Sequence, residues 1–281
     1  ESILASRHRP VVVVTNPDRP RGRHGTPQPP PIKLTAEAAG LPVLQPARIG
    51  APEAVEDLMR RGPDVFVACA YGQIVGAAVL EALPCLVVHP SPVPRWRGAA
   101  PVERALMAGE TELGVATLQM SAGVDEGPVA DERRVIVPRD ADTGTAYALL
   151  APVAVESLLA TLDAMENGSV RWREQVGEAS YAAKITADDR RIDWTRTAGE
   201  IADQVRGLSP HIGAVTELLG KRTTIWRARP HDGLPPGPAA DTLAIAAGAG
   251  WLEVLELQQE GRRRMAAAEF LRGAGRALAG P

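Results

Sequence analysis

The chain has 281 residues, a mass of 29.7 kDa and a formal net charge of −3, and 45% of its residues are hydrophobic. This length suffices for two domains, and the slightly acidic balance excludes a generally basic nucleic-acid binder while permitting a local basic face. The longest apolar runs, such as residues 11–14, are too short to cross a membrane, and no apolar stretch of signal-peptide length opens the chain. Cys69 and Cys85 lie in apolar runs without metal-ligand spacing, so we expect reduced, buried thiols in a cytoplasmic protein that has no membrane segment.

The first part of the chain alternates short apolar runs with helical stretches. Residues 1–9 look like part of a helix, and residues 52–61 predict another, because Pro52 suits a first helical position. The apolar runs, rich in valine, are residues 11–15, 42–45, 64–70 and 85–89. This alternation predicts a parallel sheet with helical crossovers.

The middle of the chain predicts two helices and a strand. Pro101 opens the first helix, and Gly109 can close it in a left-handed cap. Residues 114–120 alternate in the period of a strand with unequal faces. The second helix ends at Asn167 and Gly168, and its apolar positions are Val155, Leu158, Leu159 and Leu162.

Beyond about residue 205 the pattern changes to short strand-like runs. These runs are residues 223–228, 243–246 and 251–257, and residues 230–238 form a loop between them. We interpret this part as a small β-domain. No internal repeat is visible, and the one low-complexity segment is an Arg/Pro/Gly loop at residues 16–31.

The residues that point to chemistry are His89, at the end of a predicted parallel strand, and Asp125, in the glycine-rich segment 123–128. Open α/β sheets bind ligands at the carboxyl ends of their strands, and the proline-rich loop that follows His89 can form a pocket wall. For such a pair taken alone, the ordinary alternative is a structural histidine and a turn aspartate.

Several longer motifs extend the pattern along the chain. The segment 89–101, which contains Arg-Trp-Arg-Gly-Ala-Ala-Pro, and the segment 123–128 resemble the signature of the folate-dependent formyltransferases, and of their methionyl-tRNA branch in particular. Similarity continues, in the family's order, at residues 16–23, 70–74, 181–185, 191–194 and 259–265. The resemblance implies a Rossmann-like α/β catalytic domain with a parallel-core sheet over residues 1–180, a linker over 181–204, and an OB-like β-barrel that binds tRNA over 205–281.

The resemblance also implies the reaction: a formyl group moves from 10-formyltetrahydrofolate to the amino group of initiator methionyl-tRNA in a monomeric, cytoplasmic enzyme that uses no metal. By resemblance, His89 stabilises the oxyanion, and Asp125 orients that imidazole and helps to accept the proton. The family's folate-contacting positions are Ser91, Pro92, Val93, Pro94, Tyr71 and Gly72, although Pro92 and Val93 replace the two leucines usual there. Trp96 is expected to belong to the pocket framework.

Two departures from the family pattern affect the expected activity. Val87 stands where the family has an asparagine that donates to the formyl oxygen, and valine cannot donate. Loss of one such donor slows turnover roughly 10²- to 10³-fold. Family members also begin with a strand and a Gly-Thr-Pro-like turn, and this sequence starts at Glu1, after the position of that strand. We therefore expect an N-terminal truncation, which would leave neighbouring strands with unpaired backbone groups.

The expected tRNA contacts lie in two basic segments. By resemblance, the loop with Arg19, Arg21 and Arg23 wedges against the acceptor stem, and the alternative is a solvated, flexible loop. In the terminal domain the expected phosphate contacts are Lys221, Arg222, Arg227, Arg229, Arg262, Arg263 and Arg264, and the alternative is an ordinary charged surface.

Two other functions remain open. One is a formyltransferase that acts on a sugar-nucleotide amine or on glycinamide ribonucleotide. The arginine loop and the terminal barrel make this function less favoured. The other is a non-catalytic tRNA- or folate-binding remnant, which Val87 and the missing first strand suggest.

Overall fold

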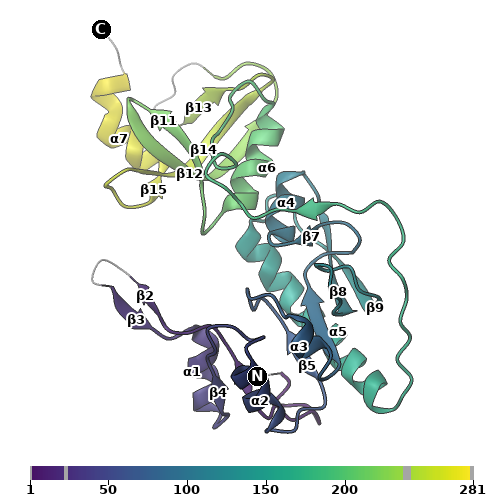
Figure 1. Cartoon of the computed structure of the whole chain (residues 1–281). Coiled ribbons are helices and arrows are strands. Elements are labelled where there is room, and N and C mark those ends of the chain that lie inside the picture. Colours follow the sequence, from purple (N-terminus) through teal and green to yellow (C-terminus); the bar gives the residue numbers. More distant parts are fainter. Residues whose placement is uncertain (1, 22–24, 237–241, 279–281) are drawn as a thin grey trace. The chain divides into compact units, whose positions relative to one another are not determined.

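The computed structural model describes residues 2–21, 25–236 and 242–278. These form two compact units (Figure 1). Unit 1 comprises Glu1–Arg97, Gly114–Arg133 and Ala151–Ala179, and unit 2 comprises Gly98–Leu113, Arg134–Leu150 and Ser180–Pro281. The chain therefore passes between the units several times.

Unit 1 is a mixed α/β structure whose sheets contain parallel pairs at their core. β1 (Val13–Val14) pairs in parallel with β4 (Val43–Leu44). The larger sheet has the order β5 (Phe66–Ala68), β6 (Cys85–His89), β8 (Glu112–Gln119) and β9 (Val129–Ile136), in which β5 and β6 are parallel and β6 and β8 antiparallel. A strand forms within each of the predicted runs 11–15, 42–45, 64–70 and 85–89, but the four strands lie in two sheets and not in one parallel sheet.

The helices of unit 1 connect these strands. They are α1 (Pro31–Ala38), α2 (Pro52–Met59) and the short α3 (Ala77–Leu80). Proline occupies the first turn of both α1 and α2, where its missing N–H costs no helical hydrogen bond. Leu58 of α2 and Val79 of α3 are fully buried in one core with Phe66 and Cys85.

Three expectations for unit 1 were wrong. Residues 2–7 form turns and bends in place of a helix, and Pro10 follows too soon for a helix to continue. β8 is buried at all six of its central positions, so it has no solvent face. Cys69 is exposed, whereas Cys85 is buried, which raises the pKa of its thiol to about 11.

The long helix α5 (Thr143–Glu166) ends as predicted, with Gly168 at φ +72°. Among the described residues, α5 is the one helix whose length and composition would allow it to cross a membrane, with a mean hydropathy of 1.6. The short apolar runs noted in the sequence therefore understate the length of this apolar segment. Its buried Ser157 hydroxyl lies 2.7 Å from the Thr117 hydroxyl of β8. This contact packs α5 against β8.

Part of the predicted low-complexity loop is ordered. β2 (Arg19–Arg21) and β3 (Thr26–Gln28) form an antiparallel hairpin in which Arg19 lies opposite Gln28. Near its base, Asp18 accepts hydrogen bonds from Gln45 at 2.6 Å and Lys33 at 3.0 Å, and these contacts hold the pKa of its carboxyl below the ordinary value. The described part of the segment is therefore anchored.

Unit 2 is built on an antiparallel sheet of order β11 (Ala214–Leu218), β12 (Lys221–His231), β14 (Trp251–Gln259) and β13 (Leu243–Ala246), and β15 (Met265–Ala266) also pairs with β14. β10 (Tyr181–Ala182) lies beside Gly98, the last residue of β7 (Arg97–Gly98). The strands predicted at 223–228, 243–246 and 251–257 are confirmed, although β12 also includes the first two residues of the loop expected at 230–238.

Helices complete unit 2. The core of the unit joins the sheet to α6 (Ala198–Leu208) and α7 (Ala267–Leu278) through Ile201, Val205 and Phe270. A helical and extended linker was expected over 181–204, and α6 begins inside that range and packs in the core of unit 2. A capping box fixes its start, because the Thr197 hydroxyl accepts from the Glu200 backbone N–H while the Glu200 carboxylate accepts from that of Thr197.

A further helix, α4 (Pro101–Met107), packs against α6 in unit 2. Gly207 allows this close approach, since a Cβ there would lie 2.9 Å from the Glu103 carbonyl oxygen. α4 begins at Pro101 and ends before Gly109, whose φ is +85°, as predicted. Its Arg104 donates to both carboxylate oxygens of Asp189, at 2.6 and 2.8 Å.

This ion pair predicts a pH-dependent contribution to stability. Arg104, and to a smaller extent Thr186, hold the pKa of the Asp189 carboxyl well below its usual range. Because the native pKa is depressed, the contribution is present above the unfolded pKa of about 3.9 and is lost as pH falls through the native value. Arg104→Ala should therefore lower the free energy of unfolding by about 2 kcal/mol near neutral pH, and the deficit should shrink in acid.

Denaturant unfolding of the parent and Arg104→Ala proteins, measured near neutral pH and again in acid below the unfolded pKa of Asp189, tests this expectation. Arg60→Ala, which removes exposed ion pairs with Glu56 and Asp57, is the control and should cost little stability at either pH, because water screens exposed pairs. Equal deficits for Arg104→Ala at both pH values would contradict the assignment.

Candidate active site

His89 is the last residue of β6, a strand buried on both faces and flanked by Pro84 and Pro90. It pairs in register with Ala116 of β8 and is itself buried. Its Nδ1 lies 3.4 Å from Oδ2 of Asp125, and its Nε2 lies 2.9 Å from the carbonyl oxygen of Trp96. The structure thus brings together the histidine and the aspartate that the sequence singled out.

Both ring nitrogens of His89 have partners. A carbonyl oxygen only accepts, so Nε2 carries the proton that is donated to Trp96. Nδ1 faces the carboxylate of Asp125, which is also largely buried. The imidazole is therefore held between the loop that follows it and the loop between β8 and β9.

The Asp125 loop is tightly constrained. Asp125 has φ +55°, a left-handed conformation that aspartate tolerates better than most residues. Two residues later, a Cβ on Gly127 would lie 1.8 Å from the Gln119 carbonyl oxygen, so only glycine fits. This close approach to the end of β8 directs the Asp125 carboxylate toward His89.

Val87 lies two residues before His89 on β6, so the two side chains project from the same face of the strand. It is half-buried and packs against the apolar groups of two neighbouring clusters, which include Leu118 of β8. The structure therefore places an apolar side chain beside the imidazole, where the resembled family has an amide.

The predicted folate-contacting residues fall into an inner and an outer set. The Ser91 hydroxyl donates to the Arg95 carbonyl oxygen at 2.8 Å, and Val93 is buried in a core with Ala116 and Leu118. Pro94 is buried as well, and Pro92 is half-buried. The side chains of Ser91 and Val93 are thus committed to the interior, which leaves the more exposed Pro92 and backbone groups of this loop for a ligand.

Tyr71 and Gly72 lie after β5, at the same edge of the parallel pair as His89. The Tyr71 ring meets Phe66 edge-on, and its buried hydroxyl has no hydrogen-bond partner among the described residues. The Tyr71 carbonyl accepts from the Asn16 amide at 2.8 Å, and Gln73 donates to the Asn16 side-chain oxygen at 3.1 Å. Polar contacts therefore tie this loop to the segment that leads into the arginine hairpin.

The predicted tRNA contacts are only partly described. Arg19 is exposed on the hairpin, the side chain of Arg21 lies outside the described structure, and Arg23 lies wholly outside it. Arg263 forms an ion pair with Glu269, and Arg264 pairs with Glu256 at 2.6 Å while its guanidinium lies 4.8 Å from the centre of the Trp226 ring.

Carboxylates thus alternate with the arginines in unit 2. Arg229 also pairs with Glu253, at 3.0 Å. Among the basic residues of this unit that were predicted to contact phosphates, those that are exposed and have no ion pair among the described residues are Lys221, Arg222, Arg227 and Arg262. The surface is charged with both signs, and these four side chains are available to a phosphate.

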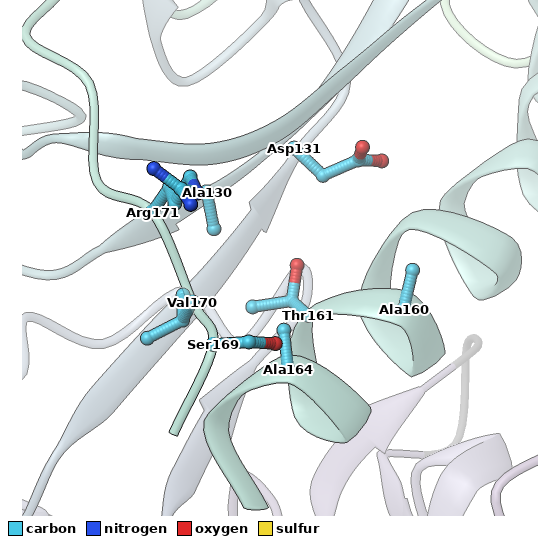
Figure 2. Close-up of a pocket in the computed structure, with 8 residues that line it drawn as sticks. All are labelled: Ala130, Asp131, Ala160, Thr161, Ala164, Ser169, Val170 and Arg171. Atoms are coloured by element: carbon cyan, nitrogen blue, oxygen red, sulfur yellow. The ribbon is translucent and has the colours of Figure 1, made fainter. Parts of the chain in front are cut away.

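A cavity of about 240 Å³ lies elsewhere in unit 1, between β9, α5 and the segment after α5 (Figure 2). Its lining residues are Ala130, Asp131, Ala160, Thr161, Ala164, Ser169, Val170 and Arg171. None of these is a predicted site residue, and no histidine or cysteine is among them. We assign this cavity no part in the reaction.

Among the described residues, one cluster has ligand atoms close enough for a metal ion: His8, Asp163 and Glu166, within 4.8 Å of one another. Arg7 already pairs with both carboxylates, at 2.9 Å each, and His8 lies 2.8 Å from Asp163. The guanidinium supplies the positive charge in this cluster, which we therefore regard as a set of ion pairs.

One contact of the site was missed from the sequence. The side-chain amide of Gln175, in the segment after α5, bonds to the backbone of the Asp125 loop and to Arg97. The partners are 50 and 78 residues away in sequence, so no local pattern reveals it.

The fold and the site define an α/β enzyme with a histidine–aspartate pair at the carboxyl end of a buried strand. A family model described as formyl transferase matches residues 4–162, and one for the C-terminal domain of formyl transferases matches residues 184–275. The chain belongs to the formyl transferase family.

Curated relatives and solved structures agree with this assignment. The chain is 41% identical to a methionyl-tRNA formyltransferase of Methylobacterium sp. (strain 4-46), covering 96% of this chain and 90% of the relative, and 42% identical to that of Symbiobacterium thermophilum, covering 98% and 88%. A methionyl-tRNA formyltransferase structure from Clostridium thermocellum shares the fold at 14% identity and a TM-score of 0.58, with coverage of 78% and 92%. The structure of HypX from Aquifex aeolicus in complex with tetrahydrofolic acid also shares the fold, at 24% identity and a TM-score of 0.63, and the match covers 80% of this chain and 41% of HypX.

Proposed function

We propose that this chain transfers the formyl group of 10-formyltetrahydrofolate to the amino group of initiator methionyl-tRNA. The observation that carries the proposal is the contact between His89 and Asp125, beside a loop whose sequence matches the methionyl-tRNA branch of the family. The high identity to relatives of that name, over nearly the whole of both chains, supports the same reaction.

In the proposed reaction the methionyl amine attacks the formyl carbon on N10 of the folate. The carbonyl oxygen becomes an oxyanion and the attacking nitrogen loses a proton. The oxyanion then collapses, the C–N bond to the folate breaks and N10 takes up a proton, so that tetrahydrofolate leaves as a neutral amine and the reaction has no net proton change. The buried imidazole of His89 donates to the oxyanion, because its Nε2 carries a proton. Asp125 holds the opposite ring nitrogen and, through its proximity, helps to accept the proton from the amine.

We further propose that the formyl donor lies against the segment 91–94 and the loop of Tyr71 and Gly72, at the edge where β5 and β6 end. The location supports this, because open α/β sheets bind ligands at the carboxyl ends of their strands. Gly72, at φ +77°, allows the backbone to turn there without a side chain in the way. The unpartnered Tyr71 hydroxyl is a further polar group at this loop.

The tRNA-binding part of the proposal rests on the hairpin and on unit 2. We propose that the antiparallel sheet of unit 2 is an OB-like barrel that contacts phosphates through its unpaired basic residues, and that residues 1–180, 181–204 and 205–281 act as catalytic domain, linker and tRNA-binding domain. A monomer in the cytoplasm, in contact with tRNA and folate, is the form expected of such an enzyme.

The direct test is formylation of methionyl-tRNA by the purified chain with 10-formyltetrahydrofolate. Formyl-methionyl-tRNA should accumulate in proportion to enzyme, and an amino sugar nucleotide offered in its place should not be formylated. Product with the sugar nucleotide alone would favour the sugar-directed reaction, and binding of tRNA without product by any repaired variant would favour the remnant.

The hairpin gives a separate prediction. Arg19→Ala should raise KM for methionyl-tRNA and lower the salt dependence of tRNA binding by about one unit of log–log slope, without a change in KM for the formyl donor. Filter binding over a range of salt concentrations measures the slope. Arg60→Ala, on the exposed face of α2, is the matched control, and equal slopes for the two variants would reject a role for the hairpin.

A further inference from the structure

The side chain of Gln175 joins two loops of unit 1. Its Nε2 donates to the carbonyl oxygens of Asp125 and Gly127, at 2.8 Å each. Its Oε1 accepts from Nε and Nη2 of Arg97, at 3.0 and 2.8 Å. One half-buried amide therefore makes four hydrogen bonds and uses both of its N–H groups.

The partners fix the orientation of this amide. Backbone carbonyls only accept and a guanidinium only donates, so a flipped amide would place oxygen against oxygen and N–H against N–H. The bonds to Arg97 also involve a charged donor, which makes them stronger than neutral ones. Arg97 reaches Glu126 as well, at 3.4 Å, so the middle residue of the Asp125 loop is tied to the same group.

These two loops are the ones that hold the imidazole of His89. The first carries Asp125, whose carboxylate faces Nδ1, and Gln175 binds the backbone of that residue. The second carries Trp96, whose carbonyl accepts from Nε2, and Gln175 binds the next residue, Arg97. A single side chain thus connects the supports of both ring nitrogens.

The two loops that hold His89 need a contact that fixes them, because each contains a residue in an unfavourable backbone conformation. Asp125 and Trp96 have φ of +55° and +60°, in the left-handed region that non-glycine residues adopt rarely. Without the amide, two carbonyl oxygens of the Asp125 loop would lose their donors, and the loop would be freer to relax. A displacement of about 1 Å at a reacting group lowers a rate by about 10²-fold.

We propose that Gln175 is a positioning residue for formyl transfer: it fixes the direction of the His89 imidazole by tying the Asp125 loop to the Arg97 loop. It touches no reacting atom, and the proposal rests on the proposed function only for its kinetic consequence. The ring orientation itself is a property of the free protein.

A closely matched control exists in unit 2. The amide of Gln204 likewise donates to two backbone carbonyls, those of Asp189 and Arg191, at 2.8 Å each, and it contacts none of the residues that hold His89. Gln204→Ala and Gln175→Ala therefore remove the same pair of N–H donors from different units, although Gln175→Ala also removes the acceptor for Arg97. Gln175→Glu adds a finer comparison, because it keeps an acceptor for Arg97 but sets a carboxylate oxygen against the carbonyls of Asp125 and Gly127.

The first readout is the ¹⁵N NMR signal of the His89 ring in the free proteins, which reports on the proton and hydrogen bond of each nitrogen. Gln175→Ala and Gln175→Glu should shift these signals, whereas Gln204→Ala should leave them as in the parent. Unchanged His89 signals in both Gln175 variants would overturn the proposal, whether or not the chain proves to be a formyltransferase.

The second readout is steady-state kinetics, in the Val87→Asn background if the parent is too slow to measure. Gln175→Ala and Gln175→Glu should lower kcat about 10- to 100-fold while KM for both substrates stays close to the parent value, since the ground-state contacts remain. Gln204→Ala should lower thermal stability and leave kcat within about twofold. The role of Gln175 would be merely structural if the Gln204 variant lost as much kcat, or if the Gln175 variants showed a raised KM with an unchanged kcat.

Discussion

His89→Ala should lower kcat for formylation of methionyl-tRNA by about 10²- to 10⁴-fold, the range typical of a positioned acid–base group. The variant removes the donor to the oxyanion and leaves the carboxylate of Asp125 facing an apolar methyl group. Because the imidazole is buried and contacts the protein on both sides, the loss should fall mainly on kcat. Single-turnover measurements at saturating folate isolate the chemical step.

The control for this experiment is His211→Ala, since His211 is exposed in unit 2. It should retain the parent rate. A His89→Ala protein that is folded and within a few-fold of the parent would remove the imidazole from the reaction, and with it the central element of the proposed function.

Val87→Asn should raise kcat by about 10²- to 10³-fold, the usual value of one oxyanion donor. Valine and asparagine have similar bulk, and position 87 lies on the same face of β6 as His89, so the new amide would stand beside the imidazole. The substitution replaces a half-buried apolar group with a polar one, so a small loss of stability should accompany the gain in rate.

The matched control is Val87→Asp, which has nearly the shape of asparagine but carries only acceptor oxygens when ionised. It should give no gain, because its charge repels the developing oxyanion. Equal rates for the parent and the folded Val87→Asn protein would show that the formyl oxygen is stabilised elsewhere. A gain in both variants would point to polarity, and not to donation, as the cause.

The strands that bear the site could be predicted from sequence because strong local signals bound them. β6 was predicted to the residue, since an unbroken apolar run between Pro84 and Pro90 has few alternatives. α4 was similarly fixed by Pro101 and Gly109. The alternation expected along β8 failed because the strand is covered on both faces, and coverage depends on α5, which lies distant in the sequence.

Other parts failed for reasons that differ in kind. The bounds of α6 were not predicted within the expected linker, although Thr197 and Glu200 form a capping box that can be recognised in the sequence. The hairpin β2–β3 was hidden by the arginine, proline and glycine composition of its segment, which is also typical of flexible loops. Gln175 has no local signal at all, because its importance comes only from the loops that it bridges.

The carbonyl of Trp96 has a consequence for selectivity between ground state and transition state. It occupies the Nε2–H of His89, so in the proposed reaction the formyl oxygen would have to compete with a neutral acceptor of nearly its own strength. That exchange gains little while the formyl oxygen is still neutral, and becomes favourable once the oxygen bears negative charge. In the proposed reaction, the Trp96 carbonyl would therefore compete well with the neutral formyl oxygen and poorly with the oxyanion. The Nε2–H of His89 would then stabilise the transition state more than the bound substrate.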